Sequence, residues 1–228
     1  YRFNLSNLEK ILFFTKNATL YTEYRKNTKL TLDIEEELSY LKKADLRFNL
    51  FTTYQMSLTT SRDKNAKYDL RSFLTTSRGN RDSYGLVLKF PPAPKWNLSL
   101  NLNTSLSKSY NAQDTLTAHE NFYQVRTQLF SDFFTWDKPL HLPFSKKPIK
   151  MAQQMKLTCD LDTQFKRSKL NVVTTNFNLY KLDFSSDFNI SRNFRWTLGG
   201  GLSYQDYIKK RANSYFAFQI NTKLQIIF

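Results

Sequence analysis

The chain has 228 residues, of which 16% are aromatic and 5 are glycine, and its 34 lysine and arginine residues outnumber 19 acidic ones to give a net charge of +15. No run of about 18 apolar residues occurs, which argues against a helical membrane protein. A lone cysteine, Cys159, excludes an intramolecular disulfide and a thiolate metal cluster. The length fits one β domain or barrel of about 200–250 residues, so we predict a single main domain.

The first 17 residues are the least regular part. Leu5, Leu8, Ile11 and Leu12 have helical spacing, so residues 1–17 are predicted as a short helix, a plug or a periplasmic lead-in, with a strand through 11–15 as the alternative. The chain begins at Tyr1 without a targeting leader, which indicates a mature or partial chain. Residues 18–228 are predicted as one β domain.

From residue 18 onward, apolar and polar side chains alternate, which is typical of strands with one apolar face. The clearest segment is 95–110, with Trp96, Leu98, Leu100 and Leu102 on one face and asparagine and serine on the other. About twelve strands are predicted, or ten if 18–25 and 169–177 do not span: 18–25, 28–41, 46–60, 67–76, 84–90, 95–110, 122–134, 153–165, 169–177, 179–190, 194–208 and 214–228. Turns are expected at 42–45 and 191–193 and a proline-rich break at 91–95, and the longest loop at 136–150.

The last segment, 214–228, carries apolar residues at alternate positions and ends on a phenylalanine. Four of its residues form the signal: Ile220, Leu224, Ile226 and Phe228. This pattern resembles the closing strand of Gram-negative outer-membrane β-barrels, which the barrel-assembly machinery recognises. The resemblance implies a superfamily and a membrane; Thr222 and Lys223 depart from its usual pattern, and it brings no catalytic or ligand-binding residues with it.

A membrane barrel and a soluble β-sandwich both show alternation, and three features favour the barrel. Several segments are about fifteen residues long, enough to cross a bilayer when tilted. Charges are almost absent from the apolar faces, and aromatic residues gather near the strand ends, where interfacial girdles lie. We therefore predict an all-β fold, an antiparallel up-and-down transmembrane β-barrel.

Basic residues concentrate at turns and strand ends. Outer-membrane lipid or lipopolysaccharide, or an acidic partner protein, is the expected contact for six of them: Lys146, Lys147, Lys150, Lys209, Lys210 and Arg211. Nucleic acid is not an expected partner, because no nucleic-acid motif occurs and the aromatic residues do not interleave with the charges.

The polar faces are predicted to line the lumen. A charge network there is expected to join five residues: Asp33, Glu35, Glu37, Arg47 and Arg71. We favour an internal salt-bridge and hydrogen-bond network that fills a narrow barrel, with a solute or ion pathway as the alternative.

An enzyme is not expected, because His119 and His141 are the only histidines and neither accompanies a nucleophile motif. No cofactor and no metal site are expected. The favoured function is a barrel subunit of a larger outer-membrane complex for secretion, assembly or uptake, with other outer-membrane or periplasmic proteins as partners. The alternatives are a small porin-like channel for anionic or polar solutes and, more distantly, a soluble basic β protein that binds anionic polymers. The expected location is the outer membrane of a Gram-negative bacterium, or else that of a mitochondrion or plastid.

Overall fold

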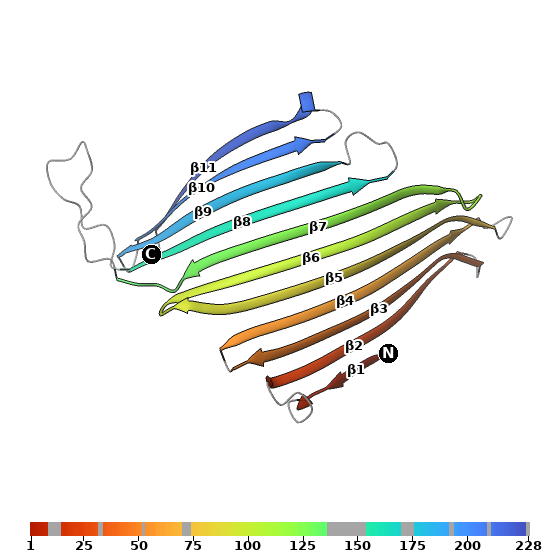
Figure 1. The fold of residues 1–228 in the computed structure, drawn as a ribbon, viewed down its shortest axis with the longest axis horizontal. Coiled ribbons are helices and arrows are strands. Elements are labelled where there is room, and N and C mark those ends of the chain that lie inside the picture. Colours follow the sequence, from red (N-terminus) through yellow and green to blue (C-terminus); the bar gives the residue numbers. More distant parts are fainter. Residues whose placement is uncertain are drawn as a thin grey trace.

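A computed structural model describes residues 1–8, 15–31, 34–51, 53–69, 74–135, 154–169, 176–191, 194–208 and 211–226. These residues form one sheet of eleven strands in sequential order, and every neighbouring pair is antiparallel (Figure 1). The predicted all-β, up-and-down architecture is confirmed. Among the described residues, no helix is long and apolar enough to cross a membrane.

Ten of the strands are 12 to 19 residues long. They follow a short first strand, β1 (Arg2–Leu5), and a 3-10 turn, η3 (Arg211–Asn213), precedes the last one. The long strands are β2 (Thr15–Thr31), β3 (Ile34–Leu50), β4 (Tyr54–Tyr68), β5 (Thr75–Ala93), β6 (Trp96–Asn111), β7 (Leu116–Ser131), β8 (Gln154–Ser168), β9 (Phe177–Ser191), β10 (Phe194–Tyr207) and β11 (Tyr215–Ile226).

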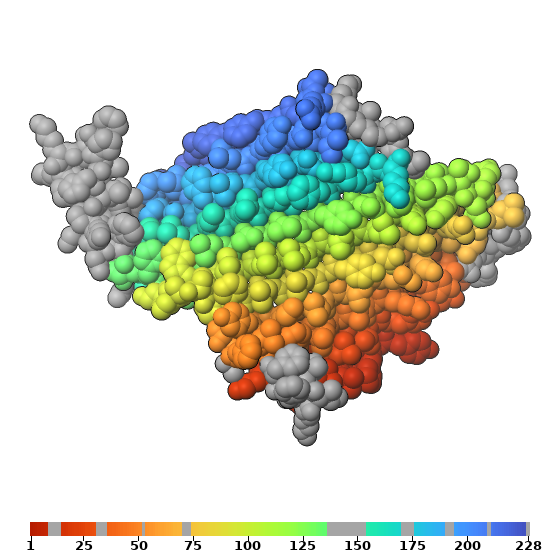
Figure 2. Space-filling view, viewed as in Figure 1, coloured from red at the N-terminus to blue at the C-terminus, as the bar shows by residue number. Residues whose placement is uncertain are grey.

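The sheet has two ends, each with its own set of connections. We call one the C end, because β11 finishes there; it holds the connections 51–53, 94–95 and 192–193. The other we call the basic end; it holds 69–74, 112–115 and 208–214. In Figure 1 the C end lies on the left and the basic end on the right. Figure 2 shows the strands as adjoining bands in sequence order.

The sheet does not close on itself within the described residues. β11 pairs only with β10, and β1 pairs only with β2. Strand β1 covers residues 20 to 23 of β2, so most of the outer edge of β2 lacks a neighbouring strand there. The two free edges are the places where further strands can add.

The described residues of the N-terminal segment, 1–8 and 15–17, are not set apart from the sheet. Residues 2–5 form a strand instead of the first turn of a helix, with Leu5 opposite Leu20, and residues 15–17 already belong to β2. The Tyr1 ammonium group donates a hydrogen bond to the Tyr24 carbonyl at 2.7 Å. The alternative strand through 11–15 lies mostly outside the described residues.

Four predicted segments have wrong boundaries. The expected turn at 42–45 lies inside β3. The expected strands at 28–41, 46–60 and 67–76 each span a connection, from β2 to β3, from β3 to β4 and from β4 to β5. Lys42, Lys43 and Asp45 interrupt the apolar pattern, but as strand residues they pair with charged or hydroxyl side chains: Lys42 lies opposite Arg62, and Asp45 lies opposite Thr59. Polar composition in the middle of a strand was therefore mistaken for a turn.

Two other expected segments change their limits. The proline-rich break begins later than predicted, because β5 continues through Pro91 and Pro92 to Ala93. Pairing of β5 with β4 stops at Lys89, so the missing N–H groups of these prolines cost no hydrogen bond with β4. The separate strand expected at 169–177 lies mostly outside the described residues: β8 ends at Ser168 and β9 begins at Phe177, while 170–175, like the loop 136–150, lie outside them.

The connection from β5 to β6 contains a strained lysine. Lys95 has φ = 67°, a left-handed conformation that costs a residue with a Cβ about 1–2 kcal/mol. We expect Lys95→Gly to raise the free energy of unfolding by about 0.5–1 kcal/mol, since glycine relieves this strain but adds flexibility to the unfolded chain. Urea titration in detergent, followed by tryptophan fluorescence, measures the change. Lys95→Ala is the control, and an equal gain from alanine would contradict the backbone explanation.

Candidate functional site: two opposite faces of one sheet

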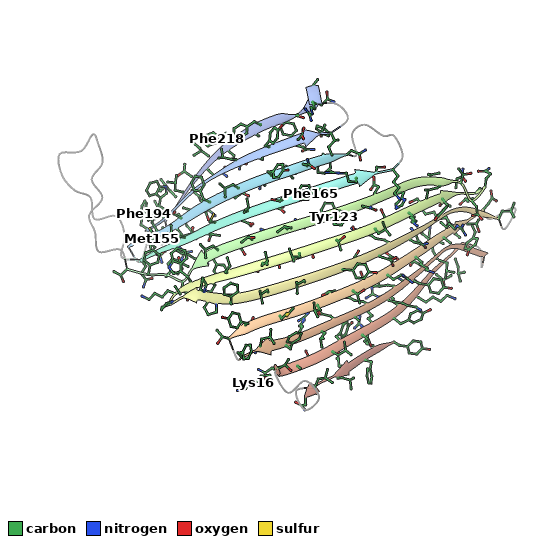
Figure 3. All side chains as sticks on the ribbon, viewed as in Figure 1. Lys16, Tyr123, Met155, Phe165, Phe194 and Phe218 are labelled. Carbon is green, nitrogen blue, oxygen red and sulfur yellow. The ribbon has the colours of Figure 1, made fainter. Side chains whose placement is uncertain are left out.

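One face of the sheet, which we call the apolar face, carries hydrophobic side chains across all ten long strands. In-register neighbours form one row over six strands: Leu20, Leu46, Leu58, Leu86, Leu102 and Val125. A second row continues to the last strand: Met56, Leu88, Leu100, Thr127, Leu161, Leu182, Leu202 and Phe218. Figure 3 shows Tyr123 and Phe165 side by side on β7 and β8, as their register requires.

No second layer of the described structure covers this face. Among the described residues only Ala18, Phe48 and Met155 are buried hydrophobic residues. The side chains of β11 are the most open, with Phe216, Phe218, Ile220, Leu224 and Ile226 each 60 to 65% exposed. Soluble monomers rarely expose contiguous apolar patches of more than a few hundred Å². The apolar face therefore requires an apolar covering.

Aromatic side chains flank the leucine-rich band at both ends. Toward the basic end, Tyr24 stacks on Tyr40 with ring centroids 6.4 Å apart, and Tyr180 stacks on Tyr204 at 6.5 Å. Toward the C end, Tyr54 lies 5.5 Å from Phe90 and Phe188 lies 5.4 Å from Trp196. The band on β6 runs from Trp96 to Leu106, about 33 Å along the strand at about 3.3 Å per residue. With a strand tilt of about 40°, this length spans a height of about 25 Å, which is that of the apolar band of a membrane barrel.

The opposite face, which we call the polar face, carries ion pairs and hydrogen bonds. Its most buried charge is Asp45, which is 4% exposed. Asp45 accepts hydrogen bonds from Arg47 Nε at 3.0 Å and Nη2 at 2.6 Å, from Ser57 Oγ at 3.0 Å and from Thr59 Oγ1 at 3.4 Å. Four donors from two strands thus converge on one carboxylate.

A second cluster of the polar face lies on β7 to β10. Arg126 donates through Nε to both oxygens of Asp160 at 2.9 Å, and its Nη2 also contacts this carboxylate. Gln124 and Gln164 both donate to Asp162, at 2.9 and 2.7 Å, and Thr197 donates to Asp187 at 2.7 Å. These contacts give Asp160, Asp162 and Asp187 hydrogen-bond partners from within the sheet.

Of the predicted lumen network, the two residues with described side chains, Glu37 and Arg47, do not meet. Glu37 and Arg47 lie toward opposite ends of β3: Glu37 lies 3.9 Å from Lys67 Nζ, and Arg47 binds Asp45. The backbone of Glu35 belongs to β3, whereas Asp33 and Arg71 lie outside the described residues. Sequence reasoning missed Asp45, Asp160, Asp162 and Asp187. An acid two positions from a base on one strand, as in Asp45 and Arg47, was the available signal, since side chains two apart share a face.

Ile220, Leu224 and Ile226 of the predicted closing signal all lie on the apolar face of β11, and Phe228 lies outside the described residues. Of the six basic residues expected to contact lipid or a partner, Arg211 lies exposed in η3 at the basic end. The other five lie outside the described residues: Lys146, Lys147, Lys150, Lys209 and Lys210.

His119 is 8% exposed on β7, and His141 lies outside the described residues. Cys159 lies on the apolar face, in register with Leu129 and Phe184, and is exposed. In the part of the chain that the structure describes, no group of three or more histidine, cysteine or acidic residues could hold a metal ion.

The fold and its two faces define a class of structure: an antiparallel sheet of long strands with one uncovered apolar face and one hydrogen-bonded polar face. The sequence matches no protein-family model. A comparison with curated proteins finds no relative. Among solved structures, the crystal structure of the ferric yersiniabactin uptake receptor FyuA from Yersinia pestis is similar, with 14% sequence identity and a TM-score of 0.43 over 99% of this chain and 40% of that chain. The present chain thus spans less than half the length of that receptor.

Proposed function

We propose that this chain is an integral outer-membrane β-barrel, or one part of such a barrel, and that it acts as a non-enzymatic barrel subunit of a larger outer-membrane complex. The observation that carries the proposal is the contrast between the two faces. Large apolar side chains stay uncovered across ten strands, while four carboxylates of the opposite face accept hydrogen bonds: Asp45, Asp160, Asp162 and Asp187. Lipid is the covering that suits a face of this extent.

Strand length and the aromatic rows support the same proposal. Each long strand has at least 12 residues, and about 9–11 residues suffice for a tilted strand to cross a bilayer. Tyrosine, tryptophan and phenylalanine at the two limits of the apolar band suit the two membrane interfaces. The alternating apolar residues Ile220, Leu224 and Ile226 of β11 resemble those of a barrel-closing strand, which suits an outer membrane.

The free edges of β1 and β11 favour a subunit that needs further strands. In lipid an unpaired strand edge is very costly, because no water satisfies its N–H and C=O groups. Closure therefore requires these two edges to meet each other, or strands from outside the described residues to join them. Partner proteins of the outer membrane or periplasm belong to the same proposal.

Electrophoresis of the detergent-extracted protein, unheated and boiled, tests the barrel together with circular dichroism. We expect a strand-rich spectrum and a faster band before boiling, because a closed barrel resists dodecyl sulfate until it is heated. Co-purification of a fixed partner is then expected for a complex subunit. Solubility in plain buffer without a heat-dependent shift would overturn the membrane proposal. Anion-selective conductance in planar bilayers without a partner would replace the subunit role by a channel.

A further inference from the structure

A groove crosses the apolar face between β2 and β7. Its apolar part is lined by the leucines of the six-strand row described above: Leu20, Leu46, Leu58, Leu86 and Leu102. A second, more polar hollow adjoins it toward the basic end and is lined by Tyr24, Lys42, Arg62 and Asp82 among others. The two hollows share Ala44, Thr60 and Tyr84. Together they form one groove with an apolar floor. Its charged end, which we call the upper end, lies toward the basic end of the sheet.

Cations surround the charged upper end, and we call four of them the basic patch: Lys26, Lys42, Arg62 and Lys64. They lie on three adjacent strands, with Lys42 opposite Arg62 and Lys64 opposite Tyr40. In-register neighbours on one face are about 4.5–5.5 Å apart at Cβ, and a strand advances about 7 Å over two residues. Flexible lysine and arginine side chains on such a grid can converge on one anion.

The basic patch keeps most of its charge unneutralised. Arg62 pairs with Asp82, with Nε 2.6 Å from Oδ1, and no other ion pair among the described residues involves the patch. Lys26 and Lys42 instead lie over the rings of Tyr40 and Tyr24, at 5.8 and 5.9 Å from the centroids. The four cations of the basic patch and the carboxylate of Asp82 together carry a net charge of +3 at the upper end of the groove.

We propose that this groove binds a phosphate-bearing lipid of the surrounding leaflet, with an acyl chain over Leu46, Leu58 and Leu86 and the head-group phosphate at Lys42, Arg62 and Lys64. The inference rests on the proposed membrane location and deepens it by naming the ligand class and its site. Charge complementarity selects an anionic head group. The continuous apolar floor selects an amphiphile over a free anion, because only a hydrocarbon chain gains from the leucine-lined part.

Native mass spectrometry of the protein in an uncharged detergent tests the site, with phosphatidylglycerol and phosphatidylcholine as probes. We expect the first phosphatidylglycerol to bind about tenfold more tightly than phosphatidylcholine, and Lys42→Gln/Lys64→Gln to remove this preference. The matched control is Arg81→Gln/Lys89→Gln, which removes the same charge from the polar face of β5 and should keep the preference. Every variant is first checked for the heat-dependent gel shift, so a failure to form a barrel is distinguished from a failure to bind lipid.

A third variant tests the apolar part of the groove. Ala44→Phe leaves the charge unchanged and fills the groove where the two hollows meet, so we expect it to weaken phosphatidylglycerol binding by about tenfold. Several results would overturn the proposal: equal affinity for the two lipids, equal loss in the two charge variants, no effect of Ala44→Phe, or displacement of the lipid by millimolar inorganic phosphate. If the unsubstituted protein formed a dimer and Lys42→Gln/Lys64→Gln made it monomeric, the surface would instead bind a second copy of the chain.

Discussion

Leu102→Arg is expected to abolish most assembly of the chain into membranes, with a cost of about 2–4 kcal/mol for an arginine at mid-bilayer on a lipid-facing strand. Leu102 lies in the middle of β6, between Leu86 and Val125, in the centre of the leucine-rich band. An arginine there would have to keep its charge in hydrocarbon or distort the bilayer around it. The measurement is the fraction of refolded protein that shows the heat-dependent gel shift in phospholipid vesicles.

Asn103→Arg is the matched control for this experiment. Asn103 is the next residue of β6, so it lies at nearly the same depth on the opposite, polar face, where it is exposed. We expect this variant to assemble at close to the unsubstituted level. If Leu102→Arg assembled as well as Asn103→Arg, lipid would not be the covering of the apolar face.

Asp45→Ala should lower the free energy of unfolding by about 1–3 kcal/mol, because three donor side chains lose a buried acceptor at once. Those donors are Arg47, Ser57 and Thr59. Asp45→Asn keeps an oxygen for Ser57 but loses the charge that holds Arg47, so we expect a smaller loss. Urea titration in detergent micelles, followed by tryptophan fluorescence, measures the free energy of unfolding of the unsubstituted protein and of the two variants.

Asp63→Ala is the control for the Asp45 series. Asp63 lies on the polar face of the adjacent strand, opposite Leu41 and Arg81, and is exposed; no ion pair or side-chain hydrogen bond of Asp63 occurs among the described residues. Its removal should change stability by less than about 0.5 kcal/mol. Equal losses from Asp45→Ala and Asp63→Ala would show that Asp45 does not anchor the polar face.

The polar network itself could not be predicted from residue types alone. Glu37 and Arg47 have opposite charges and share a face of β3, but ten residues separate them along an extended strand, and about 33 Å is too far for contact. Arg47 instead finds Asp45 two residues away, and Ser57 reaches the same carboxylate from β4. Such pairings depend on the register between strands. If the turn between two strands moves by two residues along the chain, the register changes and each side chain meets a different partner.

Strand boundaries were hardest to predict where charge interrupts the alternation. Lys42 and Asp45 suggested a turn, yet the pairing of Lys42 with Arg62 and of Asp45 with Thr59 continues the ladder through them. The middle of β3 tolerates Asp45 because Arg47 and Ser57 donate hydrogen bonds to it. Lys42 lies over the Tyr24 ring of β2. Local sequence does not show the partners that neighbouring strands supply. Pro91 and Pro92 were similarly misleading, since β5 extends beyond the part paired with β4.

The sequence by itself determined that this protein is a sheet of long antiparallel strands with one apolar face, because the two-residue period of a strand appears directly in residues such as Trp96, Leu98, Leu100 and Leu102. The tertiary structure alone decided which side chains meet across strands. Register brought Lys42, Arg62 and Tyr24 to the upper end of a leucine-lined groove and gathered four donors on Asp45. Those arrangements are long-range, and no pattern within a single strand specifies them.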